Sequence, residues 1–249
     1  MPALPEAFLG RPIAHRALHG PGAPENSGPA IARAIAAGYG IEIDVQLSSD
    51  GRAMVFHDYD LQRLTGTKGA VQQRSAAALA DLRLLGTEAA IPTLREVLAQ
   101  VAGAVPLLIE VKDQDGTLGP RVGPLEDAVA ADLESYSGPV AVMSFNPHSV
   151  AHFAGAAPQI ARGLTTDAFT AEDWPTIPAA TRDRLRDFPD YHHVGASFIS
   201  HAADDLDNPR VTELKNAGAA ILCWTIRSAA AEAQARRIAQ NVTFEGYDA

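Results

Sequence analysis

The sequence predicts an α/β protein with a (β/α)8 TIM-barrel fold and a small insertion after the second strand. First, short apolar runs alternate with helical stretches of about 10–15 residues, the pattern of parallel strands joined by crossover helices. Second, the chain of 249 residues has the size of one such barrel. Third, 47% of the residues are hydrophobic, and no low-complexity tract or long linker interrupts them. We therefore expect one domain over residues 1–249, with the insertion at approximately 48–105.

Eight apolar runs qualify as the strands of the barrel. They cover residues 12–16, 40–48, 106–112, 139–145, 161–165, 195–200, 219–226 and 242–245. One helix is expected to begin at Asn26 or Ser27 and another at Thr93, because these side chains can accept a hydrogen bond from the first helical turn. A short helix is expected between them, near Ala76–Leu84. The later helices are expected at about 124–136, 148–155, 179–187, 208–217 and 228–239.

A β-hairpin is predicted where the second strand ends. Asp50-Gly51 is a dipeptide favoured in two-residue type I′ turns, because both central residues need positive φ. The run Ala53–His57 would then return antiparallel to the second strand, and for that reason it is not counted among the eight. In this register His57 lies directly opposite Asp44, with both side chains on one face.

Charge and composition exclude several classes of protein. The net charge of −10 argues against binding to nucleic acid or to an anionic membrane surface. The single cysteine, Cys223, excludes an intramolecular disulfide and a cysteine metal cluster. The N-terminal residues do not have the pattern of a signal peptide, and no run reaches the ~18 apolar residues of a membrane span. We therefore expect a soluble, cytoplasmic protein without stable membrane insertion.

Polar side chains gather near the carboxyl ends of the predicted strands, where the active sites of such barrels lie. Glu42 and Asp44 alternate with apolar residues and therefore share one face of the second strand. Glu110 and Lys112 likewise share one face of the third strand. His15 and Arg16 lie at the end of the first strand, and Trp224 lies near the end of the seventh. Each of these residues alone would more often be structural. Their joint position at strand ends favours a functional site.

The chemistry of this set predicts phosphodiester cleavage. Three carboxylates buried together without a partner would be costly, and such hard oxygen ligands suit Mg²⁺ or Ca²⁺, with Mn²⁺ as a third candidate. Arg16 and Lys112 would hold an anion with several oxygens beside this metal. His15 and His57 supply a possible general base and general acid near neutral pH.

A series of motifs resembles the glycerophosphodiester phosphodiesterase family. In the family's order, over about residues 12–226, they read IAHR, PENS, IEIDVQLSSDG, VFHD, IPTL, LLIEVK, SFNP and CWTIRS. Three departures are visible: Ala17 replaces the glycine of the family's HRG, Ser27 replaces the threonine of PENT, and Thr243-Phe244-Glu245 replaces ITD. None of them removes a catalytic group.

The resemblance implies a role for each candidate residue. Glu42, Asp44 and Glu110 would hold the divalent metal. His15 would act as general base and His57 as general acid. Arg16 and Lys112 would contact the phosphate, and Trp224 would form a wall of the alcohol pocket.

The implied activity is metal-dependent hydrolysis of small-molecule glycerophosphodiesters to sn-glycerol 3-phosphate and an alcohol. Two alternatives stay open at this point. One is a lysophospholipase-D-type activity on a longer lipid, which an apolar lip on the barrel mouth would favour. The other is a catalytically silent barrel that binds a phosphorylated ligand, although such a barrel would be expected to have lost one of the histidines or carboxylates. The native metal, the preferred alcohol and the oligomeric state are likewise open. So is the choice between direct attack by water and attack by a glycerol hydroxyl that first gives a cyclic phosphate.

Overall fold

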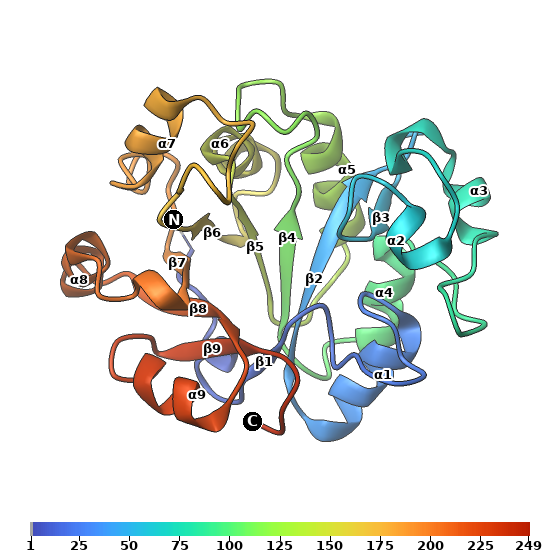
Figure 1. The fold of residues 1–249 in the computed structure, drawn as a ribbon, viewed down its shortest axis with the longest axis horizontal. Coiled ribbons are helices and arrows are strands. Elements are labelled where there is room, and N and C mark those ends of the chain that lie inside the picture. The colour runs from blue at the N-terminus through green and yellow to red at the C-terminus, as the bar shows by residue number, and fades with distance from the viewer. Residues whose placement is uncertain (1) are drawn as a thin grey trace.

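The computed structural model describes residues 2–249 and contains a closed barrel of eight parallel strands, which confirms the predicted fold class (Figure 1). The barrel strands follow one another in the order β1-β2-β4-β5-β6-β7-β8-β9, and β9 pairs with β1 to close the ring. Their bounds are β1 Ile13–Ala14, β2 Gly40–Leu47, β4 Leu107–Val111, β5 Val140–Ser144, β6 Ala161–Thr166, β7 Phe198–Ala202, β8 Ala220–Ile226 and β9 Asn241–Phe244. The short strand β3, Ala53–Val55, pairs antiparallel with β2 outside the ring.

Helices connect the strands and surround the barrel (Figure 1). They are α1 Gly28–Ala37, α2 Gln62–Thr65, α3 Ala76–Ala80, α4 Leu94–Val101, α5 Pro124–Leu133, α6 Pro147–Ala156, α7 Ala179–Leu185, α8 Pro209–Asn216 and α9 Ala229–Ala235, with 3-10 turns η1 Glu6–Leu9, η2 Val71–Gln73 and η3 Ala203–Asp205. The predicted caps are present: the Ser27 side chain accepts from the N–H of Ala30, and Thr93 forms a capping box with Glu96. None of the helices in residues 2–249 combines the length and the apolar composition that crossing a bilayer requires.

The inside of the barrel is apolar toward the amino ends of its strands. Phe8 on η1 is fully buried there, in one cluster with Leu108, Met143, Phe198 and Leu222. This cluster fills the barrel interior near the amino ends of the strands. Because side chains alternate along a strand, the next inward-facing position after Leu108 on β4 is Glu110. The inward-facing polar residues near the carboxyl ends of the strands therefore lie directly above an apolar layer.

The segment between β2 and α4 forms a lobe beside the barrel, on the opposite side from α7 and α8 in Figure 1. It contains β3, α2, η2 and α3. The lobe has its own small apolar cluster, in which Met54 and Phe56 from the hairpin pack with Leu61, Val71 and Leu79.

The predicted register of the hairpin is wrong by one residue. Val45 pairs with Val55, and Leu47 pairs with Ala53. Extended by one residue, this register places Phe56, rather than His57, opposite Asp44. The backbone agrees, because the N–H of Phe56 donates to the carbonyl of Asp44 at 3.0 Å.

The loop of the hairpin explains this difference. It has three residues, Ser49 to Gly51, and Ser48 bonds to Arg52 across its base. Gly51 has φ +77°, but Asp50 lies outside the left-handed region, so the type I′ turn is absent. A left-handed glycine at the last loop position is typical of three-residue hairpins. The Ser48 hydroxyl, which donates to Asp50 and accepts from the N–H of Arg52, stabilises this loop.

Candidate active site

All eight residues singled out from the sequence line one cavity of about 160 Å³ at the carboxyl end of the barrel. These residues are His15, Arg16, Glu42, Asp44, His57, Glu110, Lys112 and Trp224. His57 reaches the cavity although its predicted cross-strand pairing is wrong, because the chain leaves the ladder after Val55. The barrel thus brings together side chains that are up to 209 positions apart, from His15 to Trp224.

Three carboxylates form the floor of the cavity. Asp44 on β2 lies beside Glu110 on β4 in the parallel register, and Glu42 is one inward-facing position below Asp44. All three are buried, and one oxygen of each lies within 4.8 Å of the others. Burial, followed by the charges of Asp44 and Glu110, raises the pKa of Glu42 well above its ordinary value. A divalent cation would relieve this repulsion, so the donor set fits a hard metal ion.

Lys112 supplies the nearest positive charge. Its Nζ atom lies 2.9 Å from Asp44 Oδ1 and 2.6 Å from Glu110 Oε1. Burial alone would lower the pKa of Lys112, but the charges of Asp44 and Glu110 raise it above its ordinary value. Burial alone would raise the pKa of Asp44, but Lys112, His57 and Arg16 together lower it. Lys112 and Asp44 are therefore both charged at neutral pH.

The turn after β1 wraps around the carboxylates. Arg16 and Ala17 have left-handed φ values of 51° and 64°, so Ala17 occupies a position that would suit glycine. This conformation directs the N–H of Arg16 to Glu42 Oε2 at 2.8 Å. It also places the Arg16 side chain 3.0 Å from Glu25 and 3.7 Å from Asp44.

Asn26 is a site residue that the sequence reading considered only as a helix cap. Ser27 caps α1, whereas the buried Asn26 side chain turns to β2. Its Nδ2 atom donates to Asp44 Oδ2 at 2.9 Å, and its Oδ1 atom accepts from the N–H of Asp44 at 3.2 Å. Asn26 therefore fixes the orientation of a carboxylate on the cavity floor.

His15 is oriented by Glu245, at the carboxyl end of β9. The Nδ1 atom of His15 lies 2.7 Å from Glu245 Oε2, and Arg227 donates to the other carboxylate oxygen at 2.8 Å. Burial lowers the pKa of His15, although the hydrogen bond to Glu245 partly offsets this effect. Neutral His15 donates its Nδ1–H to the carboxylate, because a carboxylate can only accept. This leaves Nε2 free to take a proton.

His57 has a comparable partner in the next residue of the chain. Its Nδ1 atom lies 2.8 Å from Asp58 Oδ1, and Arg63 on α2 donates to Asp58 at 2.6 Å and to Glu25 at 2.7 Å. The lobe thus holds the second histidine through Arg63. Neither carboxylate partner, Glu245 or Asp58, was predicted from the sequence. The adjacency of Asp58 to His57 was an available signal, whereas the contact of Glu245 with His15 depends on barrel closure.

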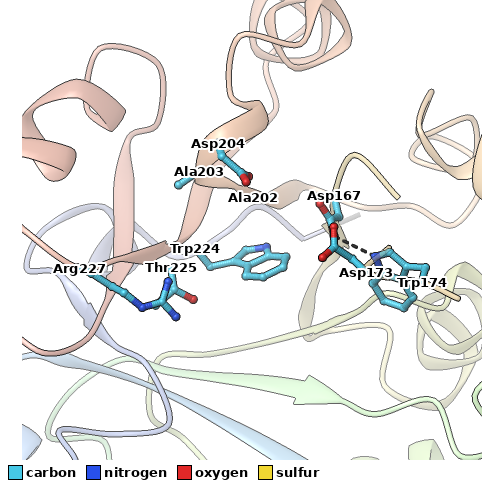
Figure 2. Close-up of a pocket in the computed structure, with 9 residues that line it drawn as sticks. All are labelled: Asp167, Asp173, Trp174, Ala202, Ala203, Asp204, Trp224, Thr225 and Arg227. Carbon is cyan, nitrogen blue, oxygen red and sulfur yellow. Dashed lines mark hydrogen bonds between the residues drawn. The ribbon is translucent and has the colours of Figure 1, made fainter. Parts of the chain in front are cut away.

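Trp224 also lines a second, larger cavity of about 450 Å³, whose lining residues are shown in Figure 2. Its indole Nε1 donates to the carbonyl of Ser200 at 3.0 Å, and its ring contacts Phe145 edge-on with centroids 5.5 Å apart. Trp224, Thr225 and Arg227 line both cavities, so the two cavities adjoin each other.

The chain is similar in sequence to known proteins. The sequence model of the glycerophosphoryl diester phosphodiesterase family matches residues 15–243. A relative from Bacillus altitudinis, named glycerophosphodiester phosphodiesterase, is 34% identical over 180 residues, which cover 67% of this chain and 72% of the relative.

Solved structures show the same fold. A phosphodiesterase from Oleispira antarctica, in complex with the product sn-glycerol-3-phosphate, matches with a TM-score of 0.79 and 26% identity, covering 96% of this chain and 94% of that one. A glycerophosphodiester phosphodiesterase from Thermotoga maritima matches with a TM-score of 0.71 over 94% of each chain. Its identity is 20%, so this second likeness concerns the fold alone.

Proposed function

The chain belongs to the glycerophosphoryl diester phosphodiesterase family, and from this premise we propose that it hydrolyses glycerophosphodiesters to sn-glycerol 3-phosphate and an alcohol. One observation carries the proposal: three buried carboxylates, two cations and two carboxylate-paired histidines surround a single cavity. The bound product of the Oleispira antarctica relative supports the identity of the phosphate-containing product.

Glu42, Asp44 and Glu110 are the proposed ligands of a divalent metal, Mg²⁺ or Ca²⁺, with Mn²⁺ as a third candidate. When bound, the metal would supply Lewis-acid stabilisation of the negative charge on the phosphoryl oxygens. The fit of the site rests on its chemistry: every donor is a carboxylate oxygen, and the elevated pKa of Glu42 reflects burial and its neighbouring negative charges.

Arg16 and Lys112 bind and orient the phosphodiester in this proposal. Both side chains form an ion pair with Asp44, which lies on barrel strand β2. Arg16 also donates to Glu25, so its guanidinium stays at the cavity edge when the substrate is absent. Trp224 forms the wall between the phosphate and the second cavity.

The two histidines divide the proton transfers. Neutral His15 accepts at Nε2 the proton of the nucleophile, which is either water or a hydroxyl of the glycerol part, and the Glu245 carboxylate stabilises the imidazolium that forms. Attack by the glycerol hydroxyl would first give a cyclic phosphate, which water then opens to glycerol 3-phosphate. His57 donates a proton to the departing alkoxide, and Asp58 orients its ring. Glu245 and Asp58 each contact the Nδ1 atom of their histidine, which leaves both Nε2 atoms available for proton transfer. Burial lowers the pKa of His15, and this supports its assignment as the general base.

The alternatives are less well supported. A lysophospholipase-D-type enzyme would need an apolar surface for an acyl chain, but the cavity next to the site is lined by Asp167, Asp173 and Asp204. A silent barrel would be expected to lack a catalytic group, whereas His15 and His57 both line the site with all three carboxylates.

The experiment is a measurement of sn-glycerol 3-phosphate released from glycerophosphocholine, with and without a chelator. We expect product in the presence of Mg²⁺, Mn²⁺ or Ca²⁺ and none in excess chelator. A doubly substituted variant, His15→Ala with His57→Ala, controls for contaminating phosphodiesterases. Release of free phosphate or of glycerol instead of glycerol 3-phosphate would contradict the proposed cleavage.

A further inference from the structure

The second cavity adjoins the catalytic cavity. It has a volume of about 450 Å³, and Trp224, Thr225 and Arg227 line both spaces. In Figure 2 the indole of Trp224 extends toward Asp167, Asp173 and Trp174, and Asp204 lies above it. A group attached to a phosphate in the catalytic cavity can therefore extend into this space.

Negative charge dominates the second cavity. Asp167, Asp173 and Asp204 line it, and none of the three forms an ion pair with another residue in the described part of the chain. Arg227 is the one cation among the lining residues, and its guanidinium is paired with Glu245 at 2.8 Å. The three carboxylates thus present uncompensated charge to whatever enters.

Two indole rings are fixed beside these carboxylates. The Trp174 Nε1 atom donates to Asp167 Oδ2 at 2.9 Å, and Trp224 donates to the carbonyl of Ser200. Phe145 packs between them, with ring centroids 4.9 Å from Trp174 and 5.5 Å from Trp224. Both indole N–H groups are already bonded, so what the two rings contribute to the cavity lining is aromatic surface. Such surfaces attract cations, above all organic ammonium groups.

We propose that this cavity receives the alcohol part of the substrate and selects alcohols that carry an ammonium group, such as choline or ethanolamine. This inference rests on the proposed function. In a glycerophosphodiester the glycerol end is neutral, so a negatively charged cavity with aromatic walls discriminates only through the other end. The carboxylates attract the positive charge, and the indoles cover the methyl or methylene groups around it.

A neutral isostere of choline tests the charge requirement. We expect kcat/KM for glycerophosphocholine to exceed that for the 3,3-dimethylbutyl ester of glycerol 3-phosphate by about tenfold or more, since the two alcohols differ in charge but hardly in shape. Asp173→Asn with Asp204→Asn should bring the two substrates close to parity, mainly by lowering the value for glycerophosphocholine. Glu172→Gln is the matched control, because this exposed carboxylate neighbours Asp173 but does not line the cavity.

A binding measurement separates this inference from the proposed function. The chain has two tryptophans, and both line the second cavity, so their fluorescence reports on it directly. Choline chloride should change the emission, whereas 3,3-dimethylbutanol and equal concentrations of sodium chloride should not.

Equal turnover of both esters, with no fluorescence response to choline, would overturn the cationic subsite while the phosphodiesterase function stands. A choline-specific response without hydrolysis of either ester would support the cation site and overturn the proposed function. Loss of the choline preference in the Glu172→Gln control would also count against the inference, because it would trace the preference to general surface charge.

Discussion

His15 and His57 lie in the same cavity, but their surroundings differ. His15 is more buried and is tied to the end of the last barrel strand, while His57 is held by Asp58 within the lobe. Burial lowers the pKa of His15, which favours the neutral ring that a general base needs. This difference supports giving the two residues separate tasks, and substrate chemistry can separate them.

The first prediction concerns this division of labour. His57→Ala should lose about 10²–10⁴-fold of its activity on glycerophosphocholine, because an alkoxide leaves poorly without a proton donor. The same variant should keep much of its activity on a nitrophenyl phosphodiester, whose leaving group needs no proton. His15→Ala should be impaired on both substrates, since the attacking hydroxyl still needs its base. Equal proportional losses on both substrates in steady-state kinetics would contradict this assignment.

Glu245 provides the second prediction at the scale of residues. Glu245→Gln should lower kcat by about 10–100-fold with little change in KM, because the imidazolium of His15 loses its compensating charge. The carboxylate raises the pKa of His15 against the effect of burial, so its removal should shift the acidic limb of the pH profile of kcat/KM to lower pH. Glu245→Asp is the matched variant: it keeps the charge and should recover part of kcat. An unchanged acidic limb in Glu245→Gln would show that Glu245 does not act through His15.

At the scale of elements, the β2–β3 hairpin positions His57. The three-residue loop goes together with the pairing of Val45 with Val55, and the paired strands end just before the segment that carries His57. Phe56 anchors this segment in the apolar cluster of the lobe, and Gln46 donates to the carbonyl of His57 at 2.8 Å. The position of a proposed catalytic residue thus depends on a turn that lies outside the barrel.

The third prediction tests that turn. Gly51 has φ +77° and open space around it, so the cost of a side chain there is conformational rather than steric. Gly51→Val should lower the free energy of unfolding by about 1–3 kcal/mol and reduce activity by displacing His57. Gly51→Asn should cost much less, because asparagine tolerates left-handed φ. Chemical denaturation combined with kinetics checks both variants, and equal effects of valine and asparagine would contradict the conformational explanation.

At the scale of the whole molecule, the buried carboxylates connect metal binding to folding. Glu42, Asp44 and Glu110 lie on adjacent strands of the closed ring, and their mutual repulsion is present in the folded protein without a cation. A ligand that binds only the folded state stabilises it by RT ln(1 + [L]/Kd), about 2.7 kcal/mol at 100 times Kd.

The fourth prediction follows from this linkage. Addition of Mg²⁺ or Ca²⁺ to chelator-treated protein should raise Tm, and excess chelator should reverse the increase. Glu110→Gln should weaken this response strongly while the Tm of the metal-free protein stays close to that of the wild type, because the relief of repulsion among the carboxylates offsets the lost ion pair with Lys112. Thermal unfolding at several metal concentrations checks it. A Tm that does not respond to any of the three metals would contradict the metal assignment.

The sequence by itself determined the barrel and most of the cavity. The barrel strands are apolar runs whose polar residues come at their carboxyl ends, so parallel pairing had to gather those residues at one end of the ring. Local capping signals at Ser27 and Thr93 likewise placed two helix starts, because the bonds that make a cap join residues only three positions apart.

The tertiary structure alone decided the register of the hairpin, the partner of His15 and the second cavity. Asp50-Gly51 is compatible with a two-residue or a three-residue loop, and the pairing of β2 with β3 selects the longer one. Glu245 meets His15 only because β9 closes the ring against β1. Asp167 and Asp204 follow β6 and β7, Trp224 lies within β8, and no local pattern relates the three residues. The partner of His15 and the second cavity depend on distances between segments that are remote in sequence, which chain closure sets and local residue preferences do not.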